Sequence, residues 1–130
     1  MLAFDGTQTT IIGSLPCRNP VEALELLDKY PLTIPAWPQL PKRSFREGMV
    51  VQYSEGLPGI RLDEKERKIW FEQDEELPAL YADFYEQALS GELEPFEISA
   101  EYAAGLDAFI GRRTLSGHTL PAVKGQVAGP

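Results

Sequence analysis

Lys124-Gly125-Gln126-Val127-Ala128-Gly129-Pro130 closes the chain with the pattern of a buried strand that runs into a turn. The apolar residues Val123 and Val127 stand around glycines, and Gly129-Pro130 is a turn signal. A matching run, Thr9-Thr10-Ile11-Ile12-Gly13-Ser14-Leu15-Pro16, opens the chain as a short β-branched strand before a Gly/Pro loop. Two such strands with helical segments between them predict a parallel α/β sheet. We therefore expect the first part of a larger α/β domain.

Composition excludes several classes of protein. The chain has 130 residues, which is enough for one domain and too few for two. Its net charge of −8 argues against nucleic acid or an anionic membrane as partner, because both carry negative charge. A single cysteine excludes an internal disulfide framework. The sequence has neither a secretory leader pattern nor an apolar run of about 18 residues. We expect a cytoplasmic protein.

Three segments have helical signals. The pair Asn19-Pro20 is a helix start, and Pro31 ends that helix. A second helix is predicted from Asp74 to about Leu89, and a third from Ser99 to about Gly111. The predicted apolar face of the first helix contains Val21, Leu24, Leu27 and Tyr30. The predicted apolar stripe of the second contains Leu77, Leu80, Tyr81, Phe84 and Ala88.

The remaining elements are shorter. A second strand is predicted at Thr33–Trp37, although Pro35 is unfavourable in a central strand. Residues 45–53 are expected to form one or two helical turns. Alternation of apolar and polar residues on both sides of a charged turn predicts a β-hairpin over about 59–72. Within an α/β barrel, such a hairpin is expected to be an insertion.

Three motifs resemble the cobalamin-independent methionine synthase superfamily, which includes uroporphyrinogen decarboxylase-like barrels. Residues 9–16 are similar to the family's Thr-Thr-x-Ile-Gly-Ser-Phe-Pro strand, and residues 124–130 to its Lys-Gly-Met-Leu-Thr-Gly-Pro strand. Residues 49–53 are loosely similar to its Met-Val-x-Tyr segment. The order of the motifs agrees over the whole chain. The resemblance implies that residues 1–130 form the N-terminal portion of a (β/α)8 TIM barrel, as one incomplete domain.

The resemblance also implies a substrate site. Ile12, Gly13 and Ser14 match the stretch that holds homocysteine through backbone and hydroxyl hydrogen bonds. The family's second strand ends in His-Gly-Glu, where the carboxylate holds the substrate amine, and this chain has Trp37-Pro38-Gln39. Gln39 is therefore a substrate-binding candidate that lacks the charge, which leaves open another thiol, a corrinoid-linked acceptor or another methyl acceptor. Cys17 and Trp37 are candidate pocket residues.

The family's chemistry is a zinc-dependent methyl transfer to a thiolate. Its zinc ligands (His, Cys, Glu, Cys) come from strands that have no counterpart in these 130 residues. Cys17 and His118 match none of those ligand motifs, so no metal site is expected in this chain, and no catalytic residue is assigned. We expect no methyl transfer by the chain alone, whether it is a truncated piece or a split gene product.

Two further expectations concern charged residues and partners. Lys42, Arg43 and Arg46 are either a receptor for an anionic substrate tail or a solvated loop, and Lys124 is expected to have a structural pairing. An incomplete barrel exposes strand edges and apolar surface, which predicts a homo-oligomer or a complex with a complementary C-terminal chain. The alternative function is a small non-enzymatic α/β domain that acts as a binding or interaction module.

Overall fold

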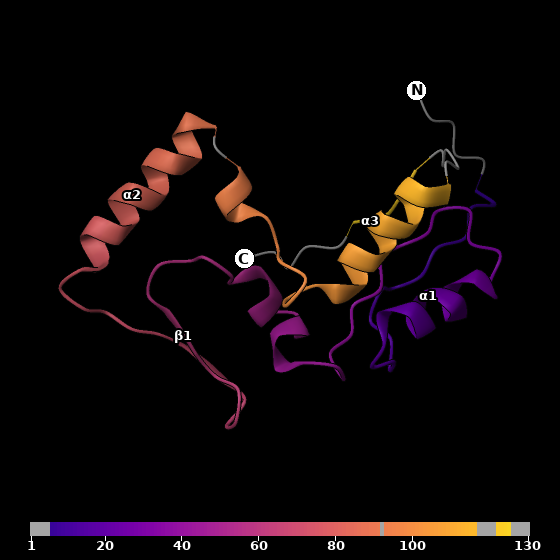
Figure 1. Ribbon diagram of the computed structural model, residues 1–130, viewed down its shortest axis with the longest axis horizontal. Helices are drawn as coiled ribbons and strands as arrows, with labels where there is room; N and C mark the ends of the chain where they lie inside the picture. The colour runs from indigo at the N-terminus through magenta and orange to yellow at the C-terminus, as the bar shows by residue number, and fades with distance from the viewer. Residues whose placement is uncertain (1–5, 92, 117–121, 126–130) are drawn as a thin grey trace.

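The computed structural model describes residues 6–91, 93–116 and 122–125 (Figure 1). These ranges form a small α/β fold in which two groups of elements lie at opposite ends of the view. Its elements in chain order are α1 (Pro20–Asp28), the 3-10 turns η1 (Phe45–Glu47) and η2 (Val51–Tyr53), β1 (Ile60–Asp63), β2 (Lys68–Phe71), α2 (Leu77–Ser90), the 3-10 turn η3 (Glu94–Phe96) and α3 (Ala104–Ser116).

Three segments run side by side in the same direction: a first segment (9–15), a second (33–39) and a third (122–125). Ser14 bridges Gln39 in parallel, and Ala36 bridges Lys124 in parallel, so the second segment lies in the middle. The contacts are isolated bridges and not a continuous ladder. Because Pro35 has no N–H to donate, it contributes only its carbonyl, which accepts from the Lys124 N–H at 2.9 Å.

Helix α1 begins as the sequence predicts. The side chain of Asn19 accepts a hydrogen bond from the Val21 N–H at 2.8 Å, and Pro20 occupies the first turn. The predicted apolar face is only partly correct. Leu24 and Leu27 are buried together with Ala23, whereas Val21 and Tyr30 are more than half exposed.

Helix α3 packs against α1 (Figure 1). Gly105, in its first turn, lies directly on the second segment: a Cβ there would be 1.9 Å from the carbonyl oxygen of Pro38. The predicted helix end near Gly111 is wrong, since α3 continues to Ser116. The predicted start is also early: Ser99 accepts hydrogen bonds through its carbonyl from a turn that precedes the helix.

The predicted hairpin is present, with β1 paired antiparallel to β2 and Leu62 opposite Ile69. Helix α2 follows it, begins three residues after Asp74, and ends at Ser90, where the next residue, Gly91, provides a left-handed cap with a φ of 81°. Its predicted apolar stripe does not form a core, because within α2 only Leu77 is buried. The Phe84 ring instead meets the Phe96 ring edge-on, 5.0 Å between centroids.

The barrel and its hairpin insertion remain predictions. Residues 126–130 of the last motif and His118 lie outside the described residues. The helices of the described ranges fall short of the length and apolar character that a membrane span requires.

Candidate functional site

Ser14 and Gln39 meet where the first and second segments end. Their backbones form the parallel bridge, with the Leu15 N–H bonded to the Gln39 carbonyl at 2.9 Å and the Gln39 N–H bonded to the Gly13 carbonyl at 2.7 Å. The Ser14 Oγ lies 3.2 Å from the Gln39 Oε1. Ser14 is exposed, whereas Gln39 is only 2 % exposed. An accessible hydroxyl therefore stands in front of a buried amide.

The Gln39 amide is the first member of a buried hydrogen-bond chain. Its Nε2 donates to the Gln52 Oε1 at 2.8 Å and to the Tyr53 hydroxyl at 3.4 Å. The Gln52 Nε2 donates to the carbonyl oxygen of Tyr102 at 2.7 Å. Burial raises the pKa of the Tyr53 phenol, and the Gln39 hydrogen bond opposes that shift. The chain connects the end of the second segment to η2 and to the turn before α3.

Glu47 fixes the backbone of Leu40, the residue that follows Gln39. Its Oε2 accepts from the backbone N–H of Leu40 at 3.0 Å, and its Oε1 accepts from Arg43 Nη1 at 2.7 Å. The backbone of Ala104 is a further hydrogen-bond partner. Burial raises the pKa of Glu47, while these hydrogen bonds act in the opposite direction. The carboxylate thus holds the second segment against the start of α3.

Gly13 fits the role of a close-approach glycine. A Cβ on Gly13 would be 2.5 Å from the carbonyl oxygen of Trp37, so a side chain there would push the two segments apart. Ile12 is 72 % exposed, and strand alternation puts its side chain on the same face as that of Ser14. Trp37 is buried at the same segment end. Substrate contact by Ile12, Gly13 and Ser14 remains a prediction.

Cys17 is buried in a hydrophobic cluster with Ala23 and Leu40, the residue after Gln39. Its surroundings are apolar, and its pocket role remains a prediction. The described residues do not fit the zinc site of the resembling family, since they contain no group of three or more His, Cys, Asp or Glu side chains arranged to hold a metal.

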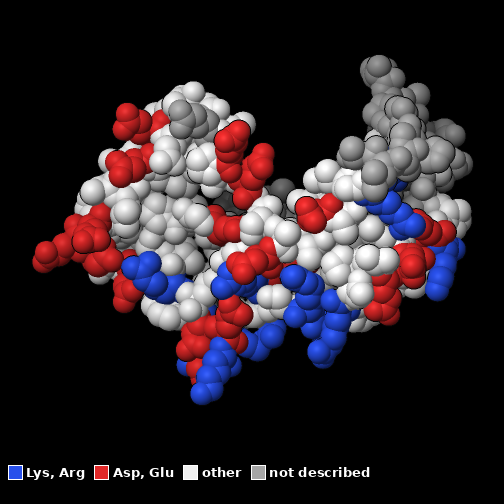
Figure 2. Space-filling view, viewed as in Figure 1, with Lys and Arg blue, Asp and Glu red and all other residues white. Residues whose placement is uncertain are grey.

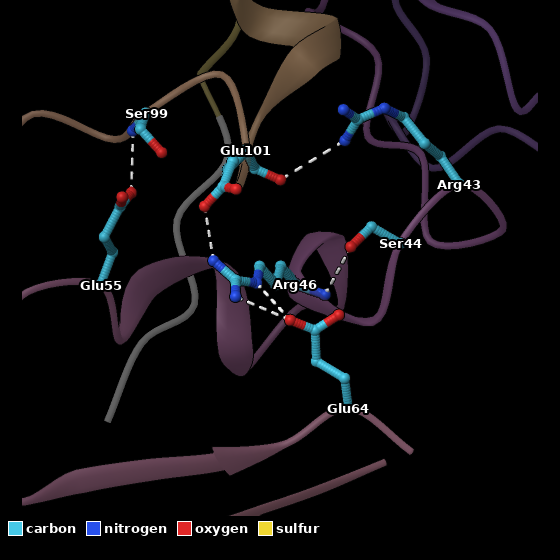
Figure 3. Close-up of polar contacts among 7 residues, drawn as sticks. All are labelled: Arg43, Ser44, Arg46, Glu55, Glu64, Ser99 and Glu101. Carbon is cyan, nitrogen blue, oxygen red and sulfur yellow. Dashed lines mark hydrogen bonds and ion pairs between the residues drawn. The ribbon is translucent and has the colours of Figure 1, made fainter.

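Arg43 and Arg46, in the loop after the second segment, are paired with carboxylates, and Figure 3 shows the pairs of Arg46. Lys42 is exposed. Arg46 lies between Glu64, 2.7 Å away in the hairpin turn, and Glu101, 2.5 Å away before α3. Its guanidinium also stacks over the Tyr102 ring, 5.2 Å from the centroid. Arg43 is paired with Glu47. Both arginines therefore have carboxylate partners within the protein. A role of these residues as receptor for an anionic substrate tail remains a prediction.

Lys124 has the structural pairing expected of it, although its partner is not a carboxylate. Its Nζ donates to the carbonyl oxygen of Ile11 at 3.0 Å, while its backbone N–H bonds Pro35 in the second segment. The side chain therefore reaches past the middle segment to the first. The contact adds a side-chain link between the first and third segments.

Charge on the molecule is uneven in the view of Figure 2. Acidic side chains dominate the end that carries α2, whereas acidic and basic side chains alternate around the centre. Helix α2 itself has Asp83 and Glu86 and no basic residue. This distribution is consistent with the net charge of −8.

Sequence reasoning named Ser14 and Gln39 but not the residues that hold them. Gln52 falls within the loosely similar segment 49–53 and Tyr102 within the helix predicted from Ser99, but neither was predicted to contact Gln39, and no pattern in the sequence marks Glu47. Comparison with protein-family models, curated proteins and solved structures gave no match. The resemblance described from the motifs therefore remains a prediction.

Proposed function

We propose that the chain is the substrate-side part of a methionine-synthase-like methyltransferase that binds a small thiol such as homocysteine, with Ser14 at the ligand. The observation that carries the proposal is the contact of Ser14 and Gln39 at the parallel bridge. Strand ends of this kind are where α/β folds bind small molecules. Gln39 acts behind Ser14, because both donors of its amide are committed to Gln52 and Tyr53.

The proposed activity of the isolated chain is binding without turnover. The motifs match only the first part of the family's catalytic barrel, and the family's zinc ligands have no counterpart among them. Methyl transfer would need a complementary C-terminal chain that supplies the metal. The methyl donor would bind to the complex of the two chains, not to this chain alone.

A titration of 15N-labelled protein with L-homocysteine tests the proposal. We expect chemical-shift changes at the amides of residues 12–15, and we expect Ser14→Ala to weaken binding about tenfold. This magnitude corresponds to the loss of one hydrogen bond to a charged group. Ser90→Ala, at the exposed end of α2, is the matched control and should bind like the wild type. Binding that is indifferent to Ser14→Ala would contradict the proposal.

A second candidate is an interaction module without catalytic function. The observation that favours it is apolar exposure far from Ser14: Trp70 is 46 % exposed in the hairpin, and Tyr85 and Leu89 are 58 % and 87 % exposed on α2. This reading proposes a homo-oligomer or a complementary chain as partner. Light scattering after gel filtration should give a mass above that of one chain, and a stable monomer at high concentration would count against self-association.

A further inference from the structure

We infer that Ser14 presents a hydrogen-bond acceptor to its ligand, so that the group bound there is a donor, such as a primary ammonium. This inference rests on the proposed function, and it specifies which part of the ligand Ser14 contacts. It follows from the direction of the hydrogen-bond chain behind Ser14. The hydrogen-bond chain begins at the backbone carbonyl of Tyr102, which can only accept.

The direction is fixed at the inner end. The Tyr102 carbonyl oxygen lies 2.7 Å from the Gln52 amide, so the atom that faces it must be the donor Nε2. The Oε1 of Gln52 then faces outward as an acceptor. Its neighbour at 2.8 Å in Gln39 must accordingly be the donor Nε2. Each amide in the chain has one possible orientation once the first is fixed.

The same argument fixes the direction of the last hydrogen bond, between Gln39 and the exposed Ser14. With the Gln39 Nε2 directed inward, its Oε1 faces the Ser14 hydroxyl at 3.2 Å. An amide oxygen only accepts, so Ser14 must donate its single proton to it. The exposed Ser14 hydroxyl then has only its lone pairs, which accept hydrogen bonds, available to solvent or a ligand. A ligand carboxylate would require that proton, whereas an ammonium would use the lone pairs as they stand.

Burial gives this direction an energetic consequence. Gln39 and Gln52 are 2 % and 0 % exposed, so water does not readily replace a missing partner. If Ser14 turned its proton toward an anionic ligand, the Gln39 Oε1 would lose its donor, which is costly for a buried group. We expect this cost to favour donor ligands about tenfold, which corresponds to one buried acceptor left without its donor.

Three probes with matched propyl chains test the inference: 3-sulfanylpropylammonium, 4-sulfanylbutanoate and thiol-free propylammonium. Each is titrated into 15N-labelled protein, and the amide shifts of residues 13–15 are followed. We expect 3-sulfanylpropylammonium to bind at least tenfold more tightly than 4-sulfanylbutanoate. Ser14→Ala should remove that preference, Ser14→Thr should keep it because the hydroxyl remains, and Ser90→Ala should leave it unchanged.

The outcomes separate the inference from the proposed function. Equal or tighter binding of 4-sulfanylbutanoate at Ser14 overturns the inference and leaves a thiol site in place. Binding of propylammonium at Ser14 as tight as that of 3-sulfanylpropylammonium supports the inference and removes the thiol from the proposed function. If neither ammonium probe shifts residues 13–15, the inference is wrong, and the L-homocysteine titration decides the proposed function independently.

Discussion

The Glu47 carboxylate accepts a hydrogen bond from the Leu40 backbone N–H at 3.0 Å, immediately beside Gln39. The side chain of Glu47 is fully buried, and its other oxygen pairs with Arg43. One residue in a 3-10 turn thereby fixes the end of the second segment. The position of Gln39, and through it of Ser14, depends on this contact.

Replacement of Glu47 by Gln should destabilise the protein. The amide keeps one acceptor oxygen for Leu40 but turns an NH2 toward Arg43, where two donors would face each other. We expect a loss of about 2 kcal/mol in the free energy of unfolding, because the buried amide NH2 is left without an acceptor, whereas the Glu47 carboxyl offers acceptor lone pairs on both oxygens in either protonation state. Urea denaturation measures it. Glu66→Gln, in the exposed hairpin turn, is the control, and an equal effect in both variants would contradict this role for Glu47.

The raised pKa of Glu47 predicts a pH dependence of stability. Because the folded protein holds the proton more tightly than the unfolded chain, the contribution of Glu47 to stability is full below the unfolded pKa, 4.5. It declines as the pH rises through the higher folded pKa. The free-energy difference between wild type and Glu47→Gln should therefore be largest in acid and smaller at neutral pH. Urea denaturation of both proteins at matched pH values checks this sign, and an increase toward neutral pH would refute it.

Local signals in the sequence predicted local structure. The Asn19 cap and Pro20 specify the start of α1 through contacts within three residues, and the alternation around residues 60–71 specifies the hairpin. Gly111 misled the prediction, because a glycine there indicates a helix end. In the structure it lies within α3, with open space around it. Tertiary packing of α3 on α1 outweighs its weak helix propensity.

The sequence predicted two residues of the candidate site, the exposed Ser14 and the buried Gln39. Ser14 and Gln39 stand at the ends of predicted strands, whereas Gln52 and Tyr102 are 13 and 63 residues beyond Gln39 and reach it through a chain of two amides. Such contacts leave no period in the sequence. The exposure of the apolar stripe of α2 was also not predictable. An amphipathic pattern shows which face of a helix is apolar, but it does not show what packs against that face.

Gly105→Ala should be far more damaging than Gly111→Ala in the same helix. The added methyl group at position 105 would lie 1.9 Å from the Pro38 carbonyl oxygen, which is backbone and cannot rotate away. We expect a loss of about 3 kcal/mol or failure to fold, as for other overpacked sites. At position 111 nothing lies within 4 Å, so alanine should stabilise α3 by about 0.5–1 kcal/mol. Thermal denaturation compares the two, and equal effects would mean that α3 does not rest on Pro38.

Arg46→Met should loosen the hairpin more than it destabilises the whole protein. Arg46 links Glu64 of the hairpin turn to Glu101 before α3, and all three side chains are partly exposed. Partly exposed pairs are weak, so we expect a loss of about 1 kcal/mol in low salt, reduced in about 1 M salt by screening. Hydrogen exchange of the amides in Ile60–Phe71 should accelerate.

The control for this variant is Arg18→Met, which removes an exposed guanidinium from the loop before α1. It should leave hairpin exchange unchanged. Since Arg46 also stacks on Tyr102, whose carbonyl anchors the amide chain behind Ser14, Arg46→Met should in addition weaken ligand binding at Ser14 slightly. Faster exchange in the hairpin with an unchanged Ser14 site would mean that the Arg46 contacts and the hydrogen-bond chain behind Ser14 are independent, with the Tyr102 backbone held by its bond to the Ser99 carbonyl.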